Sequence, residues 1–345
     1  MSNLTIERAA RHHVHIESYI FRDDSLGRRM IGLLCEKARA GVQVRLILDG
    51  IGALLGYRLR RELARAGGHA VAFLPRLASP NLRNHRKIVV CDGAVGFFGG
   101  LNVGSEYLGR GKTRDRDWAD MHMRLAGPSV WDLQWIFVED WDFCTGEFLE
   151  GTDYFAPSEG VGEAAAQVIA GGPDERPNPV RQAFLGAFVR ARRRILIATP
   201  YVVPDQGLRD VLELAARSGI EVIVVTQHPP PDHQLAFLCT LYYVRELEEA
   251  GVKVFGYRPG VMHAKAVAVD GEWAMVGTAN LDNRSMFLNF EQMTLFDGAV
   301  EAAAVTAAIE RLLLDSTRLD AAWLRGRPWL QRVLIQPARL LAPLM

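Results

Sequence analysis

The chain has 345 residues, of which 49% are hydrophobic and 23% are charged. This balance excludes a disordered, collagen-like or coiled-coil protein, and the length predicts two domains of about 150 to 180 residues each. The 40 basic and 40 acidic side chains cancel, so no overall field attracts nucleic acid or an anionic membrane, and any anion must bind locally.

Neither a metal site nor a membrane span is indicated. The four cysteines form no C-x-x-C pair, and His12, His13 and His15 alternate without a nearby carboxylate or thiol, which favours a surface position at the start of a strand. No stretch reaches the roughly 18 to 20 consecutive apolar residues of a span, and the first residues lack the apolar core of a signal peptide. We therefore expect a soluble or peripherally bound protein in a reducing compartment.

The first half alternates strands and helices. The run at 13–21 predicts a strand, 26–40 predicts a helix that ends near a glycine, and 40–50 predicts a second strand. A helical segment at 59–68 precedes strands around NHRKIVVCDG at 84–93. This alternation, with short runs rich in Val and Ile, predicts an α/β fold with buried strands.

A connector follows at 151–180, where Gly and Pro are frequent. We place the domain boundary near residue 160. The chain is thus expected to contain a first half at 1–160, a second half at 161–320 and a basic amphipathic tail at 321–345.

The second half repeats the first in the same order. AGVQVRLILDG (40–50) aligns with SGIEVIVVTQH (218–228), and NHRKIVVCDG (84–93) aligns with MHAKAVAVDG (262–271). Both pairs are offset by 178 residues, since 219 − 41 and 263 − 85 give the same number. A helix is expected at 206–217, matching the helix at 26–40. Repetition in order and spacing indicates two halves of one architecture.

Each half carries His-x-Lys followed, after four residues, by Asp. The two sets are His85, Lys87 and Asp92, and His263, Lys265 and Asp270. On a strand, residues i and i+2 face the same side, so His and Lys project together. The Asp-Gly pair that ends each set is a strong hairpin signal, and the chain is expected to turn back there.

The returning strands end in Gly-Gly-Leu-Asn102 and Gly-Thr-Ala-Asn280, which would bring amide donors beside the His and Lys side chains. An imidazole can attack phosphorus or donate a proton, and an ammonium neutralises phosphate oxygens. If only one such set were present, a buried strand with a hydrogen-bonded His and an Asp in the following turn would explain it better than a catalytic site. Two copies at matching spacing favour a catalytic site with one nucleophile and one acid.

The motifs HRKIVVCD and HAKAVAVD, each followed by G-[GT]-x-N, resemble the paired HKD motifs of the phospholipase D superfamily. The segments IESYIFRDDSLG, TPYVVPD and HAKAVAVDGEWAMVGTANLDNRSMFLNFE resemble its bacterial cardiolipin synthase branch. The resemblance covers nearly the whole chain. It implies two similar phospholipase D-like halves, each a mixed, mostly parallel β-sheet flanked by helices, with the active site at the interface between halves. It also implies no metal or organic cofactor and a covalent phosphohistidine mechanism.

The resemblance assigns roles to residues of this sequence. It implies that His85 is the nucleophile and His263 the general acid, later the base, while Lys87, Lys265, Asn102 and Asn280 hold the phosphoryl oxygens. In related members an acidic residue further along each half orients a catalytic histidine, and the matching positions are Asp120 and Glu291. We expect Asp92 and Asp270 to brace their hairpins rather than contact substrate.

The tail from Trp323 to Met345 contains four arginines and no acid, interleaved with Trp, Leu and Val. This composition fits an interfacial segment on an anionic membrane, and it fits equally a terminal helix docked on the second half. Its prolines are expected to divide any helix into short pieces.

The expected activity is transfer of a phosphatidyl group from one phosphatidylglycerol to another, giving cardiolipin and glycerol, by a peripheral protein at the cytoplasmic face of a bacterial membrane. The nearest alternative is a phospholipase D that hydrolyses its substrate. A polynucleotide phosphodiesterase is disfavoured by the balanced charge, and no nucleic-acid partner is expected. A scaffold without activity is disfavoured because both motif sets are intact.

Overall fold

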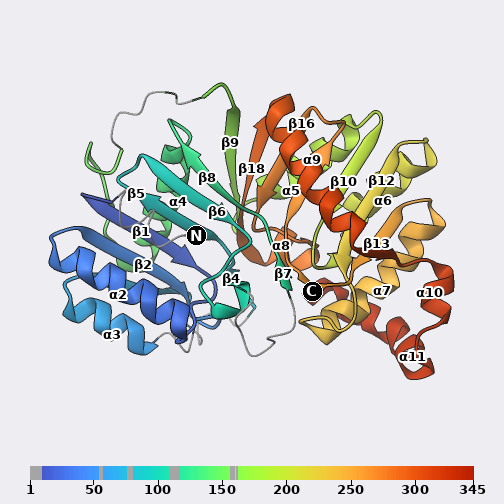
Figure 1. Ribbon diagram of the computed structural model, residues 1–345, viewed down its shortest axis with the longest axis horizontal. Coiled ribbons are helices and arrows are strands. Elements are labelled where there is room, and N and C mark those ends of the chain that lie inside the picture. The colour runs from blue at the N-terminus through green and yellow to red at the C-terminus, as the bar shows by residue number, and fades with distance from the viewer. Residues whose placement is uncertain (1–9, 54–56, 76–80, 109–116, 156–159, 161) are drawn as a thin grey trace. The chain divides into compact units, whose positions relative to one another are not determined.

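A computed structural model describes residues 10–53, 57–75, 81–108, 117–155, 160 and 162–345. The chain divides into two compact units, one of residues 1–114 and 122–163, the other of residues 115–121 and 164–345. Each unit is built around a β-sheet with helices on its faces (Figure 1). The short segment 115–121 precedes most of the second unit in sequence and nevertheless belongs to it by its contacts.

The first unit contains a six-stranded sheet in the order β3-β2-β1-β5-β6-β8. β1, β2 and β3 are parallel, and β5, β6 and β8 are added antiparallel. Its elements are β1 (His13–Ser18), α2 (Ser25–Arg39), β2 (Gln43–Asp49), α3 (Tyr57–Arg65), β3 (His69–Phe73), β4 (Arg83–Asn84), β5 (Lys87–Cys91), β6 (Val95–Gly99), a 3-10 helix (Ser105–Leu108), β8 (His122–Ala126) and α4 (Val130–Thr145).

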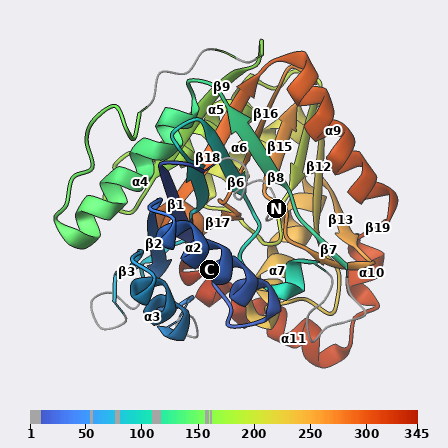
Figure 2. The same cartoon turned by 60° about the vertical axis from the view of Figure 1, so that its left-hand side comes forward.

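Helices cover both faces of this sheet. α2 and α3 lie on one face and α4 on the other (Figures 1 and 2). Helices can cover both faces because successive side chains of β1 point to opposite faces of the sheet. Val14 and Ile16 enter the core under α2, while His15 stacks on Phe137 of α4 with 4.3 Å between ring centroids. The helix predicted at 26–40 is confirmed as α2, which begins at the Asp24 cap and ends before Gly41, where φ is 89°.

The surface position predicted for His13 and His15 is wrong. Both side chains are buried because α4 covers the face of β1 from which they project. His15 Nδ1 contacts the Gln134 amide oxygen at 3.1 Å. Burial, the largest cause, lowers the pKa of His13 to about 4 and holds the pKa of His15 well below its ordinary value. His12 is exposed, as expected.

The second unit has a sheet in the order β19-β13-β12-β10-β15-β16-β18, with β9 also paired to β18. Its elements are β7 (Asp117–Ala119), β9 (Ala165–Gly171), α5 (Pro179–Arg190), β10 (Arg194–Ala198), β11 (Val202–Val203), α6 (Gln206–Arg217), β12 (Glu221–Gln227), α7 (Gln234–Glu249), β13 (Lys253–Tyr257), β14 (Gly260–Met262), β15 (Ala266–Val269), β16 (Trp273–Gly277), β17 (Leu281–Asp282), α8 (Asn283–Phe287), β18 (Asn289–Asp297), α9 (Ala299–Leu314), β19 (Ser316–Arg318), α10 (Ala321–Arg325), α11 (Trp329–Ala338) and a 3-10 helix (Arg339–Leu344).

The second unit repeats the layering of the first. α5, α6 and α7 share one core with alternate residues of β10 and β12, and α9 covers the opposite face (Figure 1). The helix predicted at 206–217 is confirmed as α6, and Gly219 follows it with φ of 91°. Within the described part of the chain, no helix has the length and apolar composition needed to cross a membrane. Residues 156–159 and 161 of the expected connector lie outside the described residues.

The predicted mixed α/β architecture with two similar halves is confirmed, but the expectation that parallel pairs would predominate is wrong. In each sheet only three strands are mutually parallel, namely β1, β2 and β3 in the first unit and β10, β12 and β13 in the second. The other strand pairs described within each unit's sheet are antiparallel, and two of them, β5 with β6 and β15 with β16, are so because an Asp-Gly turn returns the chain directly beside the strand it leaves.

The two Asp-Gly turns have the backbone that this pair favours. Asp92 and Gly93 have φ of 54° and 63°, and Asp270 and Gly271 have φ of 56° and 72°. Each carboxylate accepts hydrogen bonds from three consecutive backbone N–H groups, those of residues 11–13 for Asp92 and those of residues 192–194 for Asp270, at 2.7 to 2.8 Å. Each aspartate therefore ties its hairpin to the start of the first parallel strand.

Removing one of these carboxylates is expected to cost stability. The three N–H donors outweigh burial, which acts in the opposite direction, and lower the pKa of Asp270 below its ordinary 3.8. A group with a lowered folded pKa stabilises the protein above its unfolded pKa, and this contribution is lost as the pH falls through the folded pKa. We expect Asp270→Ala to reduce the free energy of unfolding at pH 7 by about 1 to 2 kcal/mol, measured by urea denaturation.

The matched control is Asp270→Asn, which keeps an acceptor oxygen and tolerates the left-handed backbone but loses the charge. It should fall between the wild type and Asp270→Ala at pH 7, and its difference from the wild type should shrink in acid. Equal stability of Asp270→Ala and wild type at pH 7 would rule out this role.

Candidate active site

Both His-Lys pairs adopt the same local geometry. His85 lies between β4 and β5, and His263 lies between β14 and β15. Lys87 Nζ donates to the carbonyl oxygen of His85 at 2.5 Å, and Lys265 Nζ donates in the same way to the carbonyl oxygen of His263. All four side chains are buried. Each ammonium is therefore held next to the backbone of its own histidine.

In the second unit, Asp120 contacts His263 directly. Its Oδ2 lies 2.8 Å from His263 Nδ1, and its side chain is 1% exposed. The segment that carries it is fixed by parallel pairing of β7 with β14 and by a hydrogen bond from His263 N to the Ala119 carbonyl at 2.7 Å. A carboxylate accepts but does not donate, so the ring carries a proton on Nδ1.

Burial governs the ionisation of this pair. It lowers the pKa of His263, and the nearby Lys265 charge adds to the effect, while Asp120 opposes it. Burial likewise lowers the pKa of Lys265 to about 8, against the attraction of Asp120 and Glu291. An anionic group bound beside both side chains would favour their protonated forms, so the site is suited to a phosphate oxygen.

Glu291 and Asn280 meet at Ser285 of α8. The Glu291 carboxylate is fully buried and accepts from Thr278 Oγ1 at 2.6 Å, Ser285 Oγ at 3.0 Å and Asn289 Nδ2 at 3.0 Å. Ser285 Oγ also accepts from the backbone N–H of Asn280 at 3.0 Å. These contacts hold the Asn280 backbone in place. The histidine-orienting role expected of Glu291 stays a prediction.

The Asn280 side chain retains acceptor capacity. Its Nδ2 donates to Asp282 Oδ2 at 3.0 Å, whereas its Oδ1 is buried without a hydrogen-bond partner among the described residues. In the first unit, Asn102 Oδ1 accepts from the Ile20 backbone N–H at 3.1 Å, and Asn102 Nδ2 donates to Tyr107 Oη at 2.6 Å. The two asparagines thus end equivalent hairpins but differ in their hydrogen bonds.

A small cavity in the first unit brings two predicted residues together. Lys87 and Asn102 both line it, with Ser18, Tyr107 and apolar side chains of α2. The phosphate-binding role expected of that lysine and asparagine stays a prediction. Across the described residues, no three His, Cys, Asp or Glu side chains are grouped as a metal ion would require.

Sequence reasoning missed an aromatic ring beside each histidine. The Tyr19 ring lies edge-on to His85 with 4.9 Å between centroids, and Lys87 Nζ is 5.5 Å from the centre of the same ring. In the second unit the Trp118 ring lies 5.5 Å from that of His263. Tyr19 follows the strand that pairs with β5, so its position next to the first motif was available from strand pairing.

Sequence reasoning also missed a buried polar network beside His85. The residues on either side of it, Asn84 and Arg86, are both tied to Asp140 of α4, with Arg86 Nη1 at 2.6 Å and Asn84 Nδ2 at 3.1 Å from its Oδ2. Asn84 Nδ2 also donates to Glu17 of β1, and Asn84 Oδ1 accepts from the Arg86 backbone N–H at 3.0 Å. The network therefore holds the backbone on both sides of His85.

The network is specific to the first half. Burial, reinforced by Asp140, raises the pKa of Glu17 well above its ordinary value, which favours the protonated form of Glu17 beside the Arg86–Asp140 ion pair. The residues that flank His263 are Met262 and Ala264, both apolar and fully buried. His263 relies on β7 and Asp120 instead. The two halves thus hold equivalent histidines by different means.

Comparison with known proteins finds relatives over nearly the whole chain. Residues 5–114 and 185–313 match the family described as the cardiolipin synthase PLD-like domain. The cardiolipin synthase of Geobacillus kaustophilus is 40% identical over 351 residues, covering 97% of this chain and 68% of that protein. The major cardiolipin synthase of Bacillus subtilis is 36% identical over 345 residues, covering 97% of this chain and 71% of that protein.

A solved structure supports the fold. The phosphatidylserine synthase of Haemophilus influenzae aligns with 99% of this chain and 92% of its own, with a TM-score of 0.76 and 14% sequence identity. At this identity the likeness concerns the fold alone.

Proposed function

The chain belongs to the cardiolipin synthase family of phospholipase D-like proteins, and from this premise we propose that it condenses two phosphatidylglycerol molecules to cardiolipin and glycerol. The observation that carries the proposal is the pair of His-Lys sets with one local geometry, in a chain 36–40% identical to cardiolipin synthases. The activity is that of a phosphatidyltransferase.

In the first step, a ring nitrogen of His85 attacks the phosphorus of phosphatidylglycerol. The bond from phosphorus to the glycerol oxygen breaks, and the departing glycerol takes a proton from His263. The product is a phosphatidyl group bound covalently to His85. Lys87, Lys265, Asn102 and Asn280 stabilise the charge on the phosphoryl oxygens during the displacement.

In the second step, the hydroxyl of another phosphatidylglycerol gives its proton to His263 and attacks phosphorus. The bond between phosphorus and His85 breaks, cardiolipin is released, and both histidines return to their starting states. Two displacements retain the configuration at phosphorus. The contact between Asp120 and His263 supports this role, because a carboxylate on Nδ1 stabilises the imidazolium that forms at each proton transfer.

Binding of the anionic substrate favours the protonated form of His263. Burial lowers the pKa of His263 in the free protein, and the negative phosphodiester acts in the opposite direction when it binds beside Lys265 and His263, so the ring takes up its proton from solvent. Asp92 and Asp270 have no part in these steps, since their carboxylates are engaged by backbone N–H groups at the hairpins.

The proposed substrate is an anionic membrane lipid, so the enzyme would work at a membrane surface. We place it at the cytoplasmic face of a bacterial membrane as a peripheral protein. The arginine-rich tail at 321–345, which contains no acid, supports attraction to anionic lipid.

The proposal is tested with purified protein and vesicles of labelled phosphatidylglycerol, with products separated by thin-layer chromatography. Wild type is expected to yield cardiolipin and glycerol, and His85→Ala and His263→Ala are each expected to lower turnover at least about 100-fold. The matched control is His12→Ala, an exposed histidine that should keep full activity.

The reaction products distinguish phosphatidyl transfer from hydrolysis. Phosphatidic acid as the sole product would replace transfer by hydrolysis while keeping the two-histidine site. Substantial turnover by either histidine variant would refute the mechanism.

A further inference from the structure

The tail presents one docked side and one exposed side. Ala338 and Ala342 are buried in a cluster with residues of α7, and Cys239 Sγ lies 3.2 Å from the Ala338 carbonyl. As its prolines predict, the tail forms short pieces, α10, α11 and a 3-10 helix. The tail is therefore docked on the second unit, one of the two possibilities that its composition allows, and the question becomes what covers its exposed side.

The exposed side is apolar. Seven of the 17 large hydrophobic side chains that are exposed among the described residues lie within residues 329–344, with Trp329 at 73% and Leu340 at 81% exposure. The others are Leu330, Val333, Leu334, Leu341 and Leu344. Single exposed hydrophobic residues are normal, but a concentration of them in one segment indicates a binding surface.

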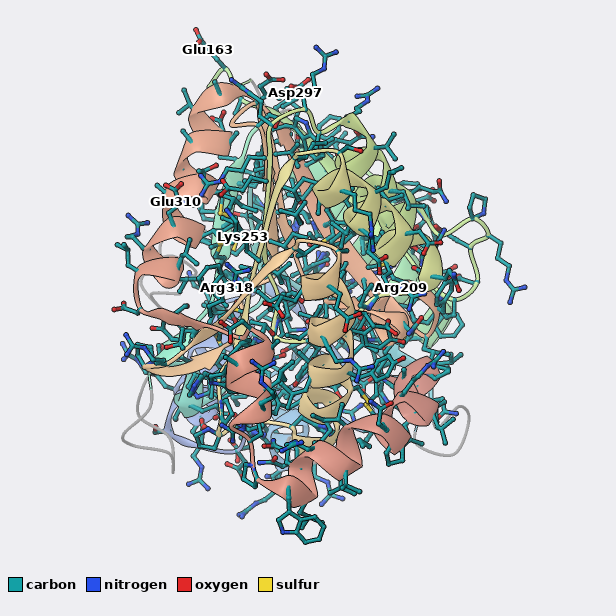
Figure 3. The ribbon with its side chains drawn as sticks, turned by 90° about the vertical axis from the view of Figure 1, so that its right-hand side faces the viewer. Glu163, Arg209, Lys253, Asp297, Glu310 and Arg318 are labelled. Carbon is teal, nitrogen blue, oxygen red and sulfur yellow. The ribbon has the colours of Figure 1, made fainter. Side chains whose placement is uncertain are left out.

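The charges of the tail indicate what binds to its exposed side. Some basic side chains elsewhere in this unit are paired, as Arg209, Lys253 and Arg318 (labelled in Figure 3) are with Glu246, Glu221 and Glu248, whereas others, such as Arg258 and Arg311, form no ion pair among the described residues. The tail differs because residues 321–345 contain no acid at all, and none of Arg325, Arg327, Arg332 and Arg339 forms an ion pair within the described chain. A second copy would bring arginines against arginines, whereas an anionic bilayer supplies both an apolar interior and negative headgroups.

The tail is also joined to the candidate site. The backbone N–H of Arg284 donates to the oxygen of Met345 at 2.7 Å, and Asn283 Nδ2 donates to the Ala342 carbonyl at 3.1 Å. Both donors belong to α8, whose Ser285 holds the backbone of Asn280. A surface bound to the tail would thus lie next to the element that positions a proposed phosphate-binding residue.

We propose that residues 329–344, with the tail arginines, form the surface through which the protein binds an anionic bilayer next to its active site. The proposal deepens the proposed function, because the bilayer carries the substrate. Arginine heads would contact headgroups while Trp329, Leu330 and Leu340 enter the boundary with the acyl chains.

The test measures binding without turnover, in the full chain carrying His263→Ala. Co-sedimentation compares vesicles of phosphatidylcholine alone with vesicles that also contain phosphatidylglycerol. We expect tighter binding to the anionic vesicles, a loss of at least about tenfold with Trp329→Ser/Leu330→Ser, and a similar loss with Arg332→Glu/Arg339→Glu. Because catalysis is already removed, the result does not depend on the proposed reaction.

The matched control is Val300→Ser/Leu314→Ser on α9, where the exposures of 77% and 81% exceed the 73% and 55% of Trp329 and Leu330. It should bind like the parent, and urea denaturation should show that the Trp329/Leu330 variant remains folded. The proposal is overturned if the control loses as much binding as the tail variants, or if all variants bind both vesicles equally. It is also overturned if the tail variants only abolish a concentration-dependent dimer in sedimentation velocity.

Discussion

Asp120→Asn is expected to lower kcat for cardiolipin formation by about 100- to 10,000-fold while changing KM little. The carboxylate lies 2.8 Å from His263 Nδ1 and can only accept a hydrogen bond there. An amide can present its NH2 group instead, which favours the ring tautomer with the proton on Nε2 and leaves the imidazolium without a counter-charge. Substrate binding should persist because His263 and both lysines remain.

The pH profile distinguishes this positioning role from loss of structure. Asp120 raises the pKa of His263 against the larger effect of burial, so its removal should lower that pKa further. The alkaline limb of the profile, where the proposed acid loses its proton, should therefore move to lower pH in Asp120→Asn. Asp297→Asn, at an exposed carboxylate of the same unit, is the control (Figure 3). Wild-type kcat in Asp120→Asn would show that His263 does not need this contact.

Arg86→Met is expected to lower the free energy of unfolding by about 3 to 5 kcal/mol. The Arg86 and Asp140 side chains are 7% and 9% exposed and lie 2.6 Å apart. Methionine fills similar space but leaves the Asp140 carboxylate buried without this cation, next to Glu17. Because Arg86 adjoins His85, the same substitution should also reduce turnover in the protein that remains folded.

The double variant Arg86→Met/Asp140→Leu is the matched control, since it removes both charges together. It should recover most of the lost stability, as replacement of a complete buried ion pair by apolar side chains is often close to neutral. Urea denaturation of the single and double variants measures both effects. A single variant as stable as the wild type, or a double variant less stable than the single, would contradict this account.

The local pattern of the chain was sufficient for several features. The helices α2 and α6 follow from hydrophobic periodicity and from the capping residues at their ends. The two hairpins follow from their Asp-Gly pairs. All of these signals act over a few residues. The repeat at an offset of 178 residues predicted two halves with equivalent motifs, and the structure has Lys87 and Lys265 in one geometry. The antiparallel pairing of β5 with β6 and of β15 with β16 follows from the same Asp-Gly signals, whereas the antiparallel pairing of β1 with β5 and of β10 with β15 depends on how distant segments meet.

What the sequence by itself determined is therefore the two-half architecture and the positions of the motif residues, because strand period and turn conformation act over a few residues and the repeat is visible in the sequence directly. The family followed from the resemblance of the two motifs and their flanking segments. Tertiary structure alone decided which distant segments meet. It placed Asp120 against His263 across 143 residues, buried His13 and His15 under α4, and surrounded Asn84 and Arg86 with carboxyl groups from β1 and α4. Such contacts depend on how helices and strands pack, since a side chain gains or loses its partners only when the covering element is in position.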